Sequence, residues 1–471
     1  MLSAAHHLPV TYGIPPPVDE TLLQRYDKAG PRYTSYPPAT AFTPHFGPEQ
    51  LRHALERSNT SRRALSLYVH IPFCRRICFY CGCNRIATRK TAIAEPYLDR
   101  LEQEMMLVGR HLDQGRVVEQ LHWGGGTPTF LNLDQMSRLI DQLAEHFNLS
   151  SAAERDFVIE IDPREADVYT LRHLQTLGFN RLSLGVQDLD ERVQKAINRV
   201  QPRELSENLI DEASRLGFRS LNLDLIYGLP HQSVESFART LDQIIDMAPA
   251  RLSVFNYAHL PERFLPQRRI NSADLPDTAT RLAIQCMTIN RLVSAGYVHI
   301  GLDHFARPDD SLAIAQREGC LQRNFQGYTT HQHCDLVGLG VSAISQIDDV
   351  YAQNPARLDQ WQNAIDQQQL ATCKGVRLSA DDRLRRHVIH RLMCDMRLDF
   401  SDLEATFDID TTYFFDRAFD QLDSFQRDGL IEYDKKKLIV TPLGRLLVRQ
   451  LAMAFDNSLS ADGSQRFSRI L

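Results

Sequence analysis

Short apolar segments alternate with amphipathic segments from about residue 64 onward. The apolar segments predict strands at 66–70, 118–123, 157–161, 181–186, 220–226 and 251–256, with a later strand at 297–302. The amphipathic segments fit helices at 97–108, 134–147, 168–177, 204–216 and 235–247. Strands that alternate with helices in this way indicate parallel strands joined by helical crossovers. The pattern therefore predicts an α/β fold built on a parallel sheet.

A short internal repeat supports this prediction. The segments GFNRLSLG (178–185), GFRSLNLD (217–224) and GYVHIGLD (296–303) each place a glycine after a helix, an aromatic residue next, and then an alternating strand. Glycine suits the left-handed backbone position that ends many helices. Six strand–helix units in sequence predict a barrel or a partial barrel, with an open doubly wound sheet as the alternative.

The pattern changes at about residue 376. Ser379 and Asp382 have the spacing of a capping box at the start of a helix, and more helix follows to about residue 427. The segment GLIEYDKKKLIV (429–440) then predicts two short strands, and Thr441–Pro442 begin a last helix. Three helices and a hairpin predict a mostly helical, winged-helix-like module.

These patterns divide the chain into four predicted parts. Residues 1–48 form an N-terminal arm, a mobile lead followed by the segment GPRYTSYP (30–37). Residues 49–305 form the barrel, residues 306–375 an extension near its site, and residues 376–471 the helical C-terminal domain. The segment GPRYTSYP has neither helical nor strand periodicity, so we expect it to fold over the open mouth of the barrel.

Composition and charge narrow the class of protein. The chain has 471 residues, of which 43% are hydrophobic and 24% charged, which excludes wholesale disorder. No apolar run approaches the length of a membrane-spanning helix. A net charge of −6 without a basic surface argues against nucleic acid. The first residues lack the Lys/Arg region of a secretory signal, so we expect a cytoplasmic protein.

Four of the nine cysteines fall within ten residues. Cys74, Cys78, Cys81 and Cys83 follow the first predicted strand with the spacing Cys-x3-Cys-x2-Cys-x-Cys. Zinc usually takes two separated pairs of ligands, so this spacing fits zinc poorly. Thiolates also hold iron–sulfur clusters. Three thiolates on a four-iron cluster would leave one iron open for a substrate or cofactor.

Polar residues gather where the predicted strands end. They are His70, Glu160, Asp162, Gln187, Asp188, Asp224, Asn256, Asp303 and His304. Ligands of parallel α/β folds bind at the carboxyl ends of strands, although any one of these residues could instead cap a helix. Gly124–Gly126 follow the second strand and allow backbone with exposed N–H groups to approach a ligand, with a plain tight turn as the alternative.

The cysteine spacing followed by GGGTP (124–128) resembles the radical S-adenosylmethionine (SAM) enzymes. Further segments resemble one family among them, the oxygen-independent coproporphyrinogen III oxidases, from about residue 21 to the end. These segments are PRYTSYP, YVHIPFC, CGCN, HWGGGTPT, DPRE, GVQD, NLDLIYGLP, SVFNYAHLP, DHFARPDD and RNFQGYTT. The resemblance implies a partial (βα)6 TIM-like radical SAM barrel with a [4Fe-4S] cluster.

The family's chemistry is implied with it. The open iron binds SAM, and an electron from the cluster cleaves SAM to a 5′-deoxyadenosyl radical. The radical removes hydrogen from the β carbon of a propionate, and loss of carbon dioxide and a further electron leaves a vinyl group. Rings A and B both react, so that coproporphyrinogen III becomes protoporphyrinogen IX in haem biosynthesis. We expect a monomer served by an electron donor such as flavodoxin or ferredoxin.

The resemblance also implies roles for individual residues. The cluster ligands are Cys74, Cys78 and Cys81. A first SAM meets Tyr68, Gly125, Glu160 and Ile344, and a second SAM meets Tyr80, Gly126, Thr127, Gln187, Arg199, Asp224 and Ala258. Tyr80 stands where the family has phenylalanine and keeps the aromatic face.

Cys83 and three arginines complete the implied site. Cys83 has a catalytic role and is not a cluster ligand. Related haem chaperones, the alternative function, typically lack both this thiol and the PRYTSYP segment. A zinc-bound winged-helix regulator would need a basic surface that the sequence does not show. Because the substrate carries four carboxylates, Arg32, Arg307 and Arg323 are its predicted partners.

Overall fold

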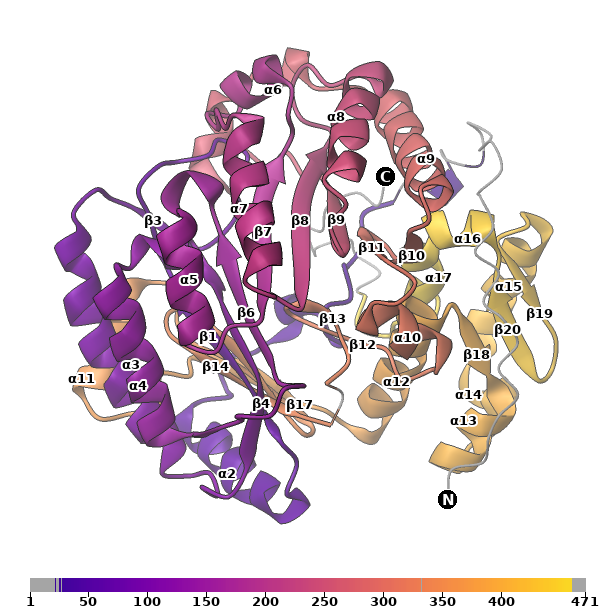
Figure 1. The fold of residues 1–471 in the computed structure, drawn as a ribbon. Helices are drawn as coiled ribbons and strands as arrows, with labels where there is room; N and C mark the ends of the chain where they lie inside the picture. Colours follow the sequence, from indigo (N-terminus) through magenta and orange to yellow (C-terminus); the bar gives the residue numbers. More distant parts are fainter. Residues whose placement is uncertain (1–21, 23–24, 27, 332, 460–471) are drawn as a thin grey trace.

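The computed structural model describes residues 22, 25–26, 28–331 and 333–459. The predicted mobile lead therefore lies outside the described residues. The barrel consists of six parallel strands, and crossover helices cover the outer face of their curved sheet (Figure 1). The strands are β1 (Leu65–Ile71), β4 (Val117–Gly125), β6 (Asp156–Ile161), β7 (Arg181–Gln187), β8 (Ser220–Tyr227) and β9 (Arg251–Asn256). The helices are α3 (Ala94–Gly109), α4 (Leu133–His146), α5 (Val168–Thr176), α6 (Glu191–Ala196), α7 (Arg203–Arg215) and α8 (Val234–Asp246).

The strand order separates a partial barrel from a doubly wound sheet. The six strands lie side by side in chain order, from β1 through β4, β6, β7 and β8 to β9. A doubly wound sheet reverses its strand order at a switch point, and this run does not reverse. The prediction of an α/β partial barrel is confirmed. The glycines that begin the three repeats also have the expected left-handed φ angles, 92° at Gly178, 74° at Gly217 and 90° at Gly296.

Strands added at both edges depart from the simple pattern. Beyond β1 lie β14 (Asp335–Leu339), parallel to it, and then the antiparallel strands β15 (Ile344–Ile347), β16 (Val350–Gln353) and β17 (Lys374–Arg377). At the other edge, β11 (His304–Ala306) separates β10 (Val298–Gly301) from β9. The third repeat therefore does not extend the parallel run, because its strand β10 pairs antiparallel with β11.

The remaining elements surround this sheet. They are α2 (Pro48–Ser58), β2 (Phe73–Cys74), β3 (Ile86–Ala87), β5 (Asn148–Leu149), α9 (Thr278–Ser294), α10 (Ser311–Arg317), β12 (Gln322–Asn324), β13 (Gly327–Thr329) and α11 (Leu358–Asp366). Short 3-10 helices lie at 39–41, 59–61, 91–93, 128–130, 163–165, 265–269 and 272–274. The pair β12–β13 forms a separate hairpin.

The C-terminal part is mostly helical and lies beside β10 and β11, in orange and yellow in Figure 1. It contains α12 (Ala380–Asp395), α13 (Phe400–Phe407), α14 (Thr411–Phe414), α15 (Asp416–Arg427), α16 (Pro442–Leu446) and α17 (Val448–Met453). The predicted capping box begins α12, since the Ser379 hydroxyl accepts from the Asp382 N–H at 3.1 Å. The predicted hairpin, β19 (Ile431–Tyr433) and β20 (Lys437–Val440), gains a third strand, β18 (Arg397–Asp399).

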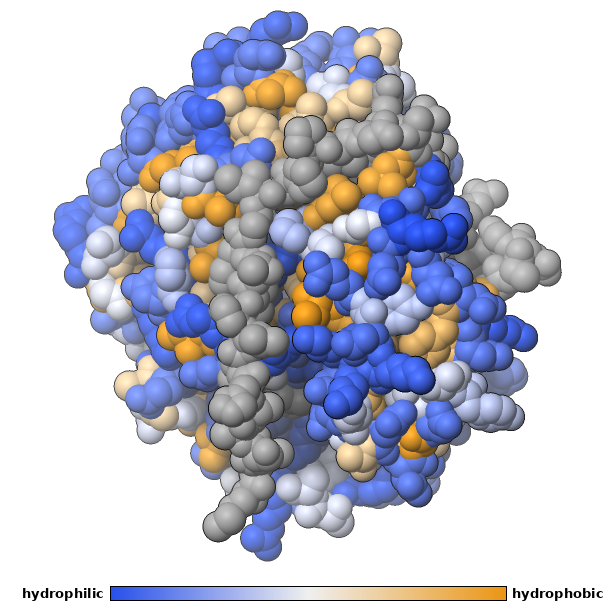
Figure 2. Space-filling view, turned by 90° about the vertical axis from the view of Figure 1, so that its right-hand side faces the viewer, coloured by the Kyte–Doolittle hydropathy of each residue, from blue (hydrophilic) through white to orange (hydrophobic). Residues whose placement is uncertain are grey.

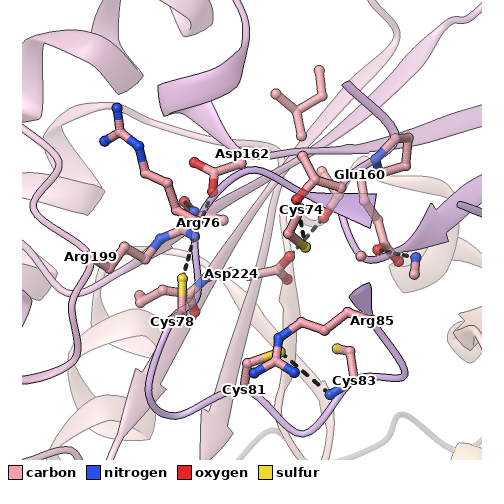
Figure 3. A pocket seen from close by; sticks show the side chains of 18 of the residues that line it. Cys74, Arg76, Cys78, Cys81, Cys83, Arg85, Glu160, Asp162, Arg199 and Asp224 are labelled. Carbon is pink, nitrogen blue, oxygen red and sulfur yellow. Dashed lines mark hydrogen bonds and ion pairs between the residues drawn. The ribbon is translucent and has the colours of Figure 1, made fainter. Parts of the chain in front are cut away.

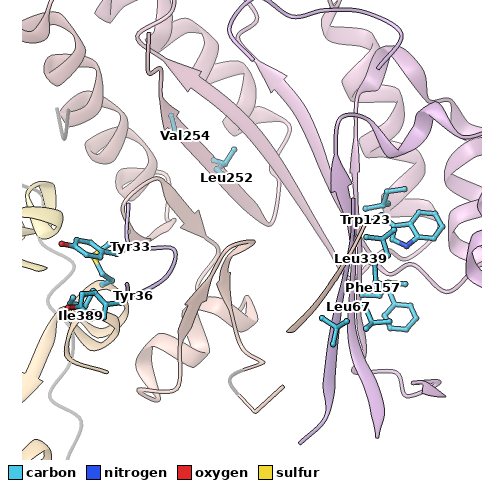
Figure 4. Close-up of a cluster of buried hydrophobic side chains, with 14 of the residues drawn as sticks. Tyr33, Tyr36, Leu67, Trp123, Phe157, Leu252, Val254, Leu339 and Ile389 are labelled. Carbon is cyan, nitrogen blue, oxygen red and sulfur yellow. The ribbon is translucent and has the colours of Figure 1, made fainter. Parts of the chain in front are cut away.

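Alternation along the barrel strands separates an apolar face from a polar face. Leu67, Trp123, Phe157 and Leu339 are buried together on neighbouring strands (Figure 4). The intervening residues are polar, and the Ser66 hydroxyl donates to Gln120 Oε1 at 2.8 Å. Because strand side chains alternate between faces, the apolar set packs under the helices and the polar set faces the barrel interior. The barrel interior therefore presents polar side chains that can contact a polar ligand.

The segment GPRYTSYP packs between the barrel and the C-terminal part. Tyr33 and Tyr36 are each 1% exposed and lie near Ile389 of α12 (Figure 4). The Tyr33 hydroxyl donates to Asp456 Oδ2 at 2.8 Å. Arg449 is also buried and donates to the carbonyl oxygens of Gly30 and Pro31. The segment is therefore a packed part of the fold.

The surface turned toward the viewer in Figure 2 is mostly hydrophilic, with small separate hydrophobic groups. Among the helices that the structure describes, none has the length and apolarity needed to span a membrane.

Candidate active site

The four crowded cysteines line a cavity at the carboxyl ends of the barrel strands (Figure 3). Their loop follows β1, and its ends are held together where β2 pairs with β3. The cavity has a volume of about 220 Å³. Residues of the predicted site that line it are Cys74, Cys78, Tyr80, Cys81, Cys83, Gly125, Gly126, Thr127, Glu160, Gln187, Arg199 and Asp224. Most of the predicted site therefore meets in one place.

Hydrogen-bond donors surround the cysteine sulfurs. The Thr127 hydroxyl lies 3.4 Å from Cys74 Sγ, and Arg164 Nη2 and Arg199 Nη1 lie 3.3 and 3.5 Å from Cys78 Sγ. The Cys83 N–H donates to Cys81 Sγ at 3.4 Å. Positive charge and N–H donors favour the thiolate, which is the form that binds metal.

The thiols differ in how their surroundings move their pKa values. A hydrogen bond from the Cys83 thiol and, to a smaller extent, the charge of Arg85 lower the pKa of Cys81 to about 6 against the opposing effect of burial. The pKa of Cys83 is raised well above its ordinary value by the same hydrogen bond and by burial. Burial raises the pKa of Cys74 to about 11. Cys81 thus becomes a thiolate more readily than Cys74 or Cys83.

The cysteine geometry distinguishes a cluster from a single zinc ion. A zinc ion holds sulfur ligands at about 2.3 Å, so they lie about 4 Å from one another. Within the part of the chain that the structure describes, the sulfurs of Cys74, Cys78 and Cys81 do not form a group whose atoms all lie within 4.8 Å. The three thiols and their basic donors fit an iron–sulfur cluster.

The glycine run has a packing role that the sequence did not reveal. A Cβ on Gly124 would lie 2.7 Å from Glu160, and one on Gly126 would lie 2.8 Å from the backbone of the cysteine loop. The Gly125 N–H donates to Glu160 Oε2 at 3.2 Å, and the Gly126 and Thr127 N–H groups donate to Ile71 and Phe73 carbonyls. The expectation of exposed N–H groups at these positions is therefore wrong, because the loop and Glu160 already use them.

Two acidic residues face the cavity, Glu160 from β6 and Asp224 from β8, with β7 between these strands. His122 Nε2 lies 3.0 Å from Glu160 Oε1, and although burial alone would raise the pKa of Glu160, His122 keeps it lowered. Asp224 accepts from the Ser183 hydroxyl at 2.9 Å and from Asn222 Nδ2 at 2.8 Å. Burial raises the pKa of Asp224 to about 6. The pKa of Glu160 is therefore lowered, whereas the pKa of Asp224 is raised.

Asp162 organises the basic side of the cavity. Its Oδ2 accepts from Arg164 Nη2 at 2.7 Å and from Arg199 Nη1 at 2.9 Å. Burial alone would raise the pKa of Asp162, but Arg199 and Arg164 lower it to about 2. Arg199 also donates to the Gly185 carbonyl at 2.6 Å. The guanidinium groups next to Cys78 are thus fixed in place by a permanently ionised carboxylate.

Three other predicted SAM contacts lie outside the lining of this cavity. The Tyr68 hydroxyl is 3.1 Å from His70 Nδ1, and its ring lies beside that of His122. Gln267 Nε2 donates to the carbonyls of both Ala258 and Tyr80, which joins the segment after β9 to the cysteine loop. Ile344 begins β15, beside the end of β14.

The three predicted substrate arginines lie in different places. Arg32 donates to the carbonyl of Asn256, at the carboxyl end of β9, at 3.3 Å, and lies 4.0 Å from Asp303. Arg307 donates to the carbonyls of Ala248 and Pro249, just before β9. It therefore lies at the amino ends of the barrel strands, away from the cysteine cavity. Arg323 lines a separate cavity, described below.

Some lining residues were not among the predicted site residues. They are Arg76, Arg85, Pro128, Ile161, Ser183, Gly185 and Phe255, whereas Asp162 was expected as one of the polar residues at the strand ends. Ser183 and Gly185 share the strand face of Gln187, so strict alternation along 183–187 carried a signal for them. Arg164 lies next to Asp162 in the sequence, but its contact with Cys78 joins residues 86 positions apart and left no local signal.

Comparison with known proteins identifies the family. Residues 68–244 match the model of the radical SAM superfamily, and residues 378–447 match that of the HemN C-terminal domain. The oxygen-independent coproporphyrinogen III oxidase of Pseudomonas aeruginosa is 54% identical, covering 96% of this chain and 98% of its own. That of Escherichia coli is 50% identical, with 96% and 98% covered.

A solved structure gives the same result at the level of the fold. The structure of coproporphyrinogen III oxidase (HemN) from Escherichia coli, described as a radical SAM enzyme, superposes with a TM-score of 0.89. The sequences are 48% identical, and the match covers 94% of this chain and 99% of the other. The resemblance seen in the sequence motifs is confirmed: the chain belongs to the oxygen-independent coproporphyrinogen III oxidase family of the radical SAM superfamily.

Proposed function

We propose that this chain converts coproporphyrinogen III to protoporphyrinogen IX without oxygen, by oxidative decarboxylation of the propionates on rings A and B. The observation that carries the proposal is the cysteine cavity. Three thiols with the spacing of a four-iron cluster share it with Glu160, Asp224 and the Asp162–Arg199 pair. When bound, the [4Fe-4S] cluster and SAM supply the radical that removes hydrogen from an unactivated carbon.

The residues of the chain hold and orient these groups. Cys74, Cys78 and Cys81 are the proposed cluster ligands. Arg164 and Arg199 donate to Cys78 Sγ, and donors to the sulfurs are one of the means by which a protein tunes a cluster. Cys83 is not needed as a ligand, and its own thiol bonds to Cys81, so we assign it a role in the reaction with substrate.

The carboxylates are proposed to position SAM. Glu160 stands at the end of β6 and accepts from the Gly125 N–H, and with Tyr68, Gly125 and Ile344 it forms the proposed contacts of a first SAM. Asp224 stands two strands away on β8. With Tyr80, Gly126, Thr127, Gln187, Arg199 and Ala258, it forms the proposed contacts of a second SAM. Because SAM carries a cationic sulfonium and an ammonium group, nearby carboxylates favour its binding.

Arg32 is the best-placed of the predicted substrate arginines. Its side chain is 40% exposed and lies at the carboxyl end of β9, next to the cavity residue Phe255. The buried segment around Tyr33 and Arg449 holds the backbone there, so the guanidinium is presented from a rigid base. A guanidinium can bind a propionate carboxylate in bidentate geometry, which orients the substrate.

The proposed setting of the reaction follows from its chemistry. Each turnover consumes an electron to cleave SAM, so the chain needs a donor such as flavodoxin or ferredoxin. All nine cysteines are free thiols, as in a reducing compartment such as the cytoplasm.

We propose a monomer without a nucleic-acid partner, since Lys435–Lys437 lie at a turn beside Asp434 and not on a wider basic surface.

An anaerobic assay tests the proposed function. Protein reconstituted with iron and sulfide is incubated with SAM, a reductant and coproporphyrinogen III, and the products are identified by mass spectrometry. The expected product is protoporphyrinogen IX, formed through a mono-vinyl intermediate. Cys78→Ala should abolish both cluster and product, whereas Cys373→Ala, at an exposed cysteine, should leave both unchanged. Binding of haem without any decarboxylation would instead favour the haem-chaperone alternative.

A further inference from the structure

A second cavity lies at the opposite end of the barrel from the cysteines. It has a volume of about 330 Å³ and is lined by Ser66 at the start of β1, by Asp335 and Leu336 at the start of β14, by β12 and by α12. At about 3.3 Å per residue, the length of β1 places the two cavities about 20 Å apart. Within the described chain they share no lining residue. The second cavity is therefore a separate site.

One wall of this cavity is a basic face of α12. Arg383, Arg386, His387, His390 and Arg391 all line it. These positions follow the spacing i, i+3, i+4, i+7 and i+8, which places them on one face of a helix. Arg383 and Arg386, three positions apart on this face, carry like charges that repel one another unless an opposite charge approaches them.

The facing wall carries a buried and unpaired cation. Arg323 of β12 is 5% exposed, and its Nε and Nη1 have no hydrogen-bond partner among the described residues. Its guanidinium lies 4.9 Å from the centre of the Tyr328 ring. His390 is 8% exposed, and its Nε2 is also without a partner in that part of the chain. Buried polar groups are normally hydrogen-bonded, so two such groups at one cavity call for a ligand.

The acidic residues at the cavity do not neutralise this charge. Asp335 accepts from Arg116 Nη2 at 2.6 Å, and Arg391 pairs with Asp395 at 2.7 Å. Arg386 donates only to the backbone carbonyl of Asp348, at 3.3 Å, among the bonds found for the described chain. Within the described residues, no carboxylate lies within 4.0 Å of Arg323, Arg383 or Arg386. These three arginines are therefore available to an anion.

The surroundings of His387 and His390 lower the pKa values of both imidazoles. Burial and, to a smaller extent, Arg391 lower the pKa of His387 to about 4. Burial also lowers the pKa of His390 well below its ordinary value, and Arg386, Arg391 and Arg323 add to this effect. Burial, with a smaller contribution from the nearby arginines, thus favours neutral imidazoles and leaves the arginines as the charged groups.

We propose that this cavity binds a compact polyanion, a carboxylate or phosphate compound with at least two negative charges, between Arg323 and the basic face of α12. Guanidinium groups bind both oxyanions in bidentate geometry. The volume lies at the lower end of the range for small-molecule pockets, which suits a compact ligand better than a tetrapyrrole. The site is independent of the proposed reaction, so its test succeeds or fails apart from turnover.

Calorimetric titration of the cluster-loaded protein, under anaerobic conditions, tests this proposal. Citrate and pyrophosphate are the probes, in chloride buffer at matched ionic strength. Wild-type protein should bind at least one of them saturably, at about one per chain. Arg383→Gln/Arg386→Gln should weaken that binding tenfold or more. The control Arg239→Gln/Arg417→Gln carries the same charge change on exposed residues of α8 and α15 and should bind within twofold of wild type.

The outcomes separate the sources of the anion and the failure of the proposal. Tighter binding of citrate identifies a carboxylate ligand, and tighter binding of pyrophosphate identifies a phosphate ligand. Arg383→Gln alone changes an exposed side chain and should still weaken binding about threefold, so a folding defect in the double variant would not hide the effect. Absence of saturable binding of both probes, or equal binding by the double variant, would overturn the proposal.

Discussion

At the scale of single residues, the two thiols at the end of the cysteine motif have different roles. The Cys83 N–H donates to Cys81 Sγ, and a hydrogen bond from the Cys83 thiol lowers the pKa of Cys81 to about 6. Cys81 is therefore prepared to be a thiolate ligand, whereas the raised pKa of Cys83 keeps it a thiol. A neutral thiol can donate hydrogen to substrate or product, which a ligand cannot do.

Cys83→Ser should separate cluster binding from turnover. We expect the variant to retain about four irons per chain, because three thiolates suffice to hold the cluster. Product formation should fall by about 10²-fold or more, the scale of losing a group that transfers a proton or hydrogen. Iron content and turnover are measured on the same anaerobic preparation. Loss of the cluster would make Cys83 a ligand, and full turnover would make it a packing residue.

Asp224→Asn should weaken SAM binding and change its dependence on pH. Burial raises the pKa of Asp224 to about 6, so the carboxylate is ionised above that pH and protonated below it. Wild-type affinity for SAM should therefore fall as the pH falls through about 6. The variant should bind about tenfold more weakly at pH 8, since a hydrogen bond to a charged group is lost, with no pH dependence from this position.

Equilibrium titration of SAM from pH 5 to pH 8 checks this prediction, and circular dichroism checks the fold. Ser424→Ala, at the surface of α15, is a control that leaves the barrel untouched. A matching pH dependence in wild type and variant would show that Asp224 does not contact SAM. Collapse of the circular dichroism signal would show that its carboxyl group is structural.

At the scale of elements, a buried carboxyl group joins α3 to the end of β14. Glu104 accepts from the Gly340 N–H at 2.6 Å and from Asn354 Nδ2 at 2.7 Å. Tyr97, also on α3, donates to the carbonyl of His70 at the end of β1 at 2.6 Å. The helix therefore fixes the carboxyl ends of two adjacent strands, next to which the cysteine loop begins.

Glu104 should make stability depend on pH in a defined direction. Burial raises its pKa from an ordinary value near 4.5 to about 7, so the folded protein holds this proton more tightly than the unfolded chain. The stabilising contribution is full below about pH 4.5 and is lost as the pH rises through about 7. The melting temperature of wild type relative to Glu104→Gln should therefore fall between pH 5 and pH 8. A constant difference over that range would contradict the assignment.

The elements also show which parts of the fold the sequence could predict. The six parallel strands and their helices follow from local periodicity, because each strand alternates and each crossover is amphipathic. The partnership of β1 with β14 joins Leu65 to Asp335, and no local pattern records such a distant pairing. The same holds for β10, whose repeat resembles a barrel strand although its partner β11 runs antiparallel.

The residues of the site also divide into those that the sequence could predict and those that it could not. Cys74, Glu160 and Asp224 could be predicted because motifs and strand ends mark them in the sequence. Arg164 and the second cavity could not, because they depend on how β12, α12 and the barrel pack together. The N–H groups after β4 were wrongly expected to be free, since hydrogen bonding to a distant loop leaves no trace in the sequence of a glycine run.

At the scale of the whole molecule, the N-terminal segment, the barrel and the C-terminal part pack together. Tyr33 is buried and bonds to Asp456, and Arg449 holds the backbone of Gly30 and Pro31. Deleting this segment would open the packing of the C-terminal part as well as remove Arg32. A point substitution of Arg32 is therefore a cleaner test of the segment's role than truncation.

Arg32→Gln should raise the KM for coproporphyrinogen III about tenfold and leave SAM binding unchanged. The expected size corresponds to the loss of one hydrogen-bonded ion pair with a propionate. The matched control is Arg25→Gln, just before that segment, where the exposed guanidinium pairs with Asp428. Equal KM values for wild type and Arg32→Gln in steady-state assays would show that Arg32 does not hold substrate.

By the proposed function, this chain removes hydrogen from the β carbon of a propionate by radical SAM chemistry. The most direct measurement uses coproporphyrinogen III deuterated at the β carbons of its propionates, in an anaerobic reaction with the cluster-loaded protein. Mass spectrometry should find deuterium in the 5′-deoxyadenosine and a vinyl group in the porphyrin product. Unlabelled 5′-deoxyadenosine formed alongside the vinyl product would contradict the account, because the hydrogen would then have left by another route.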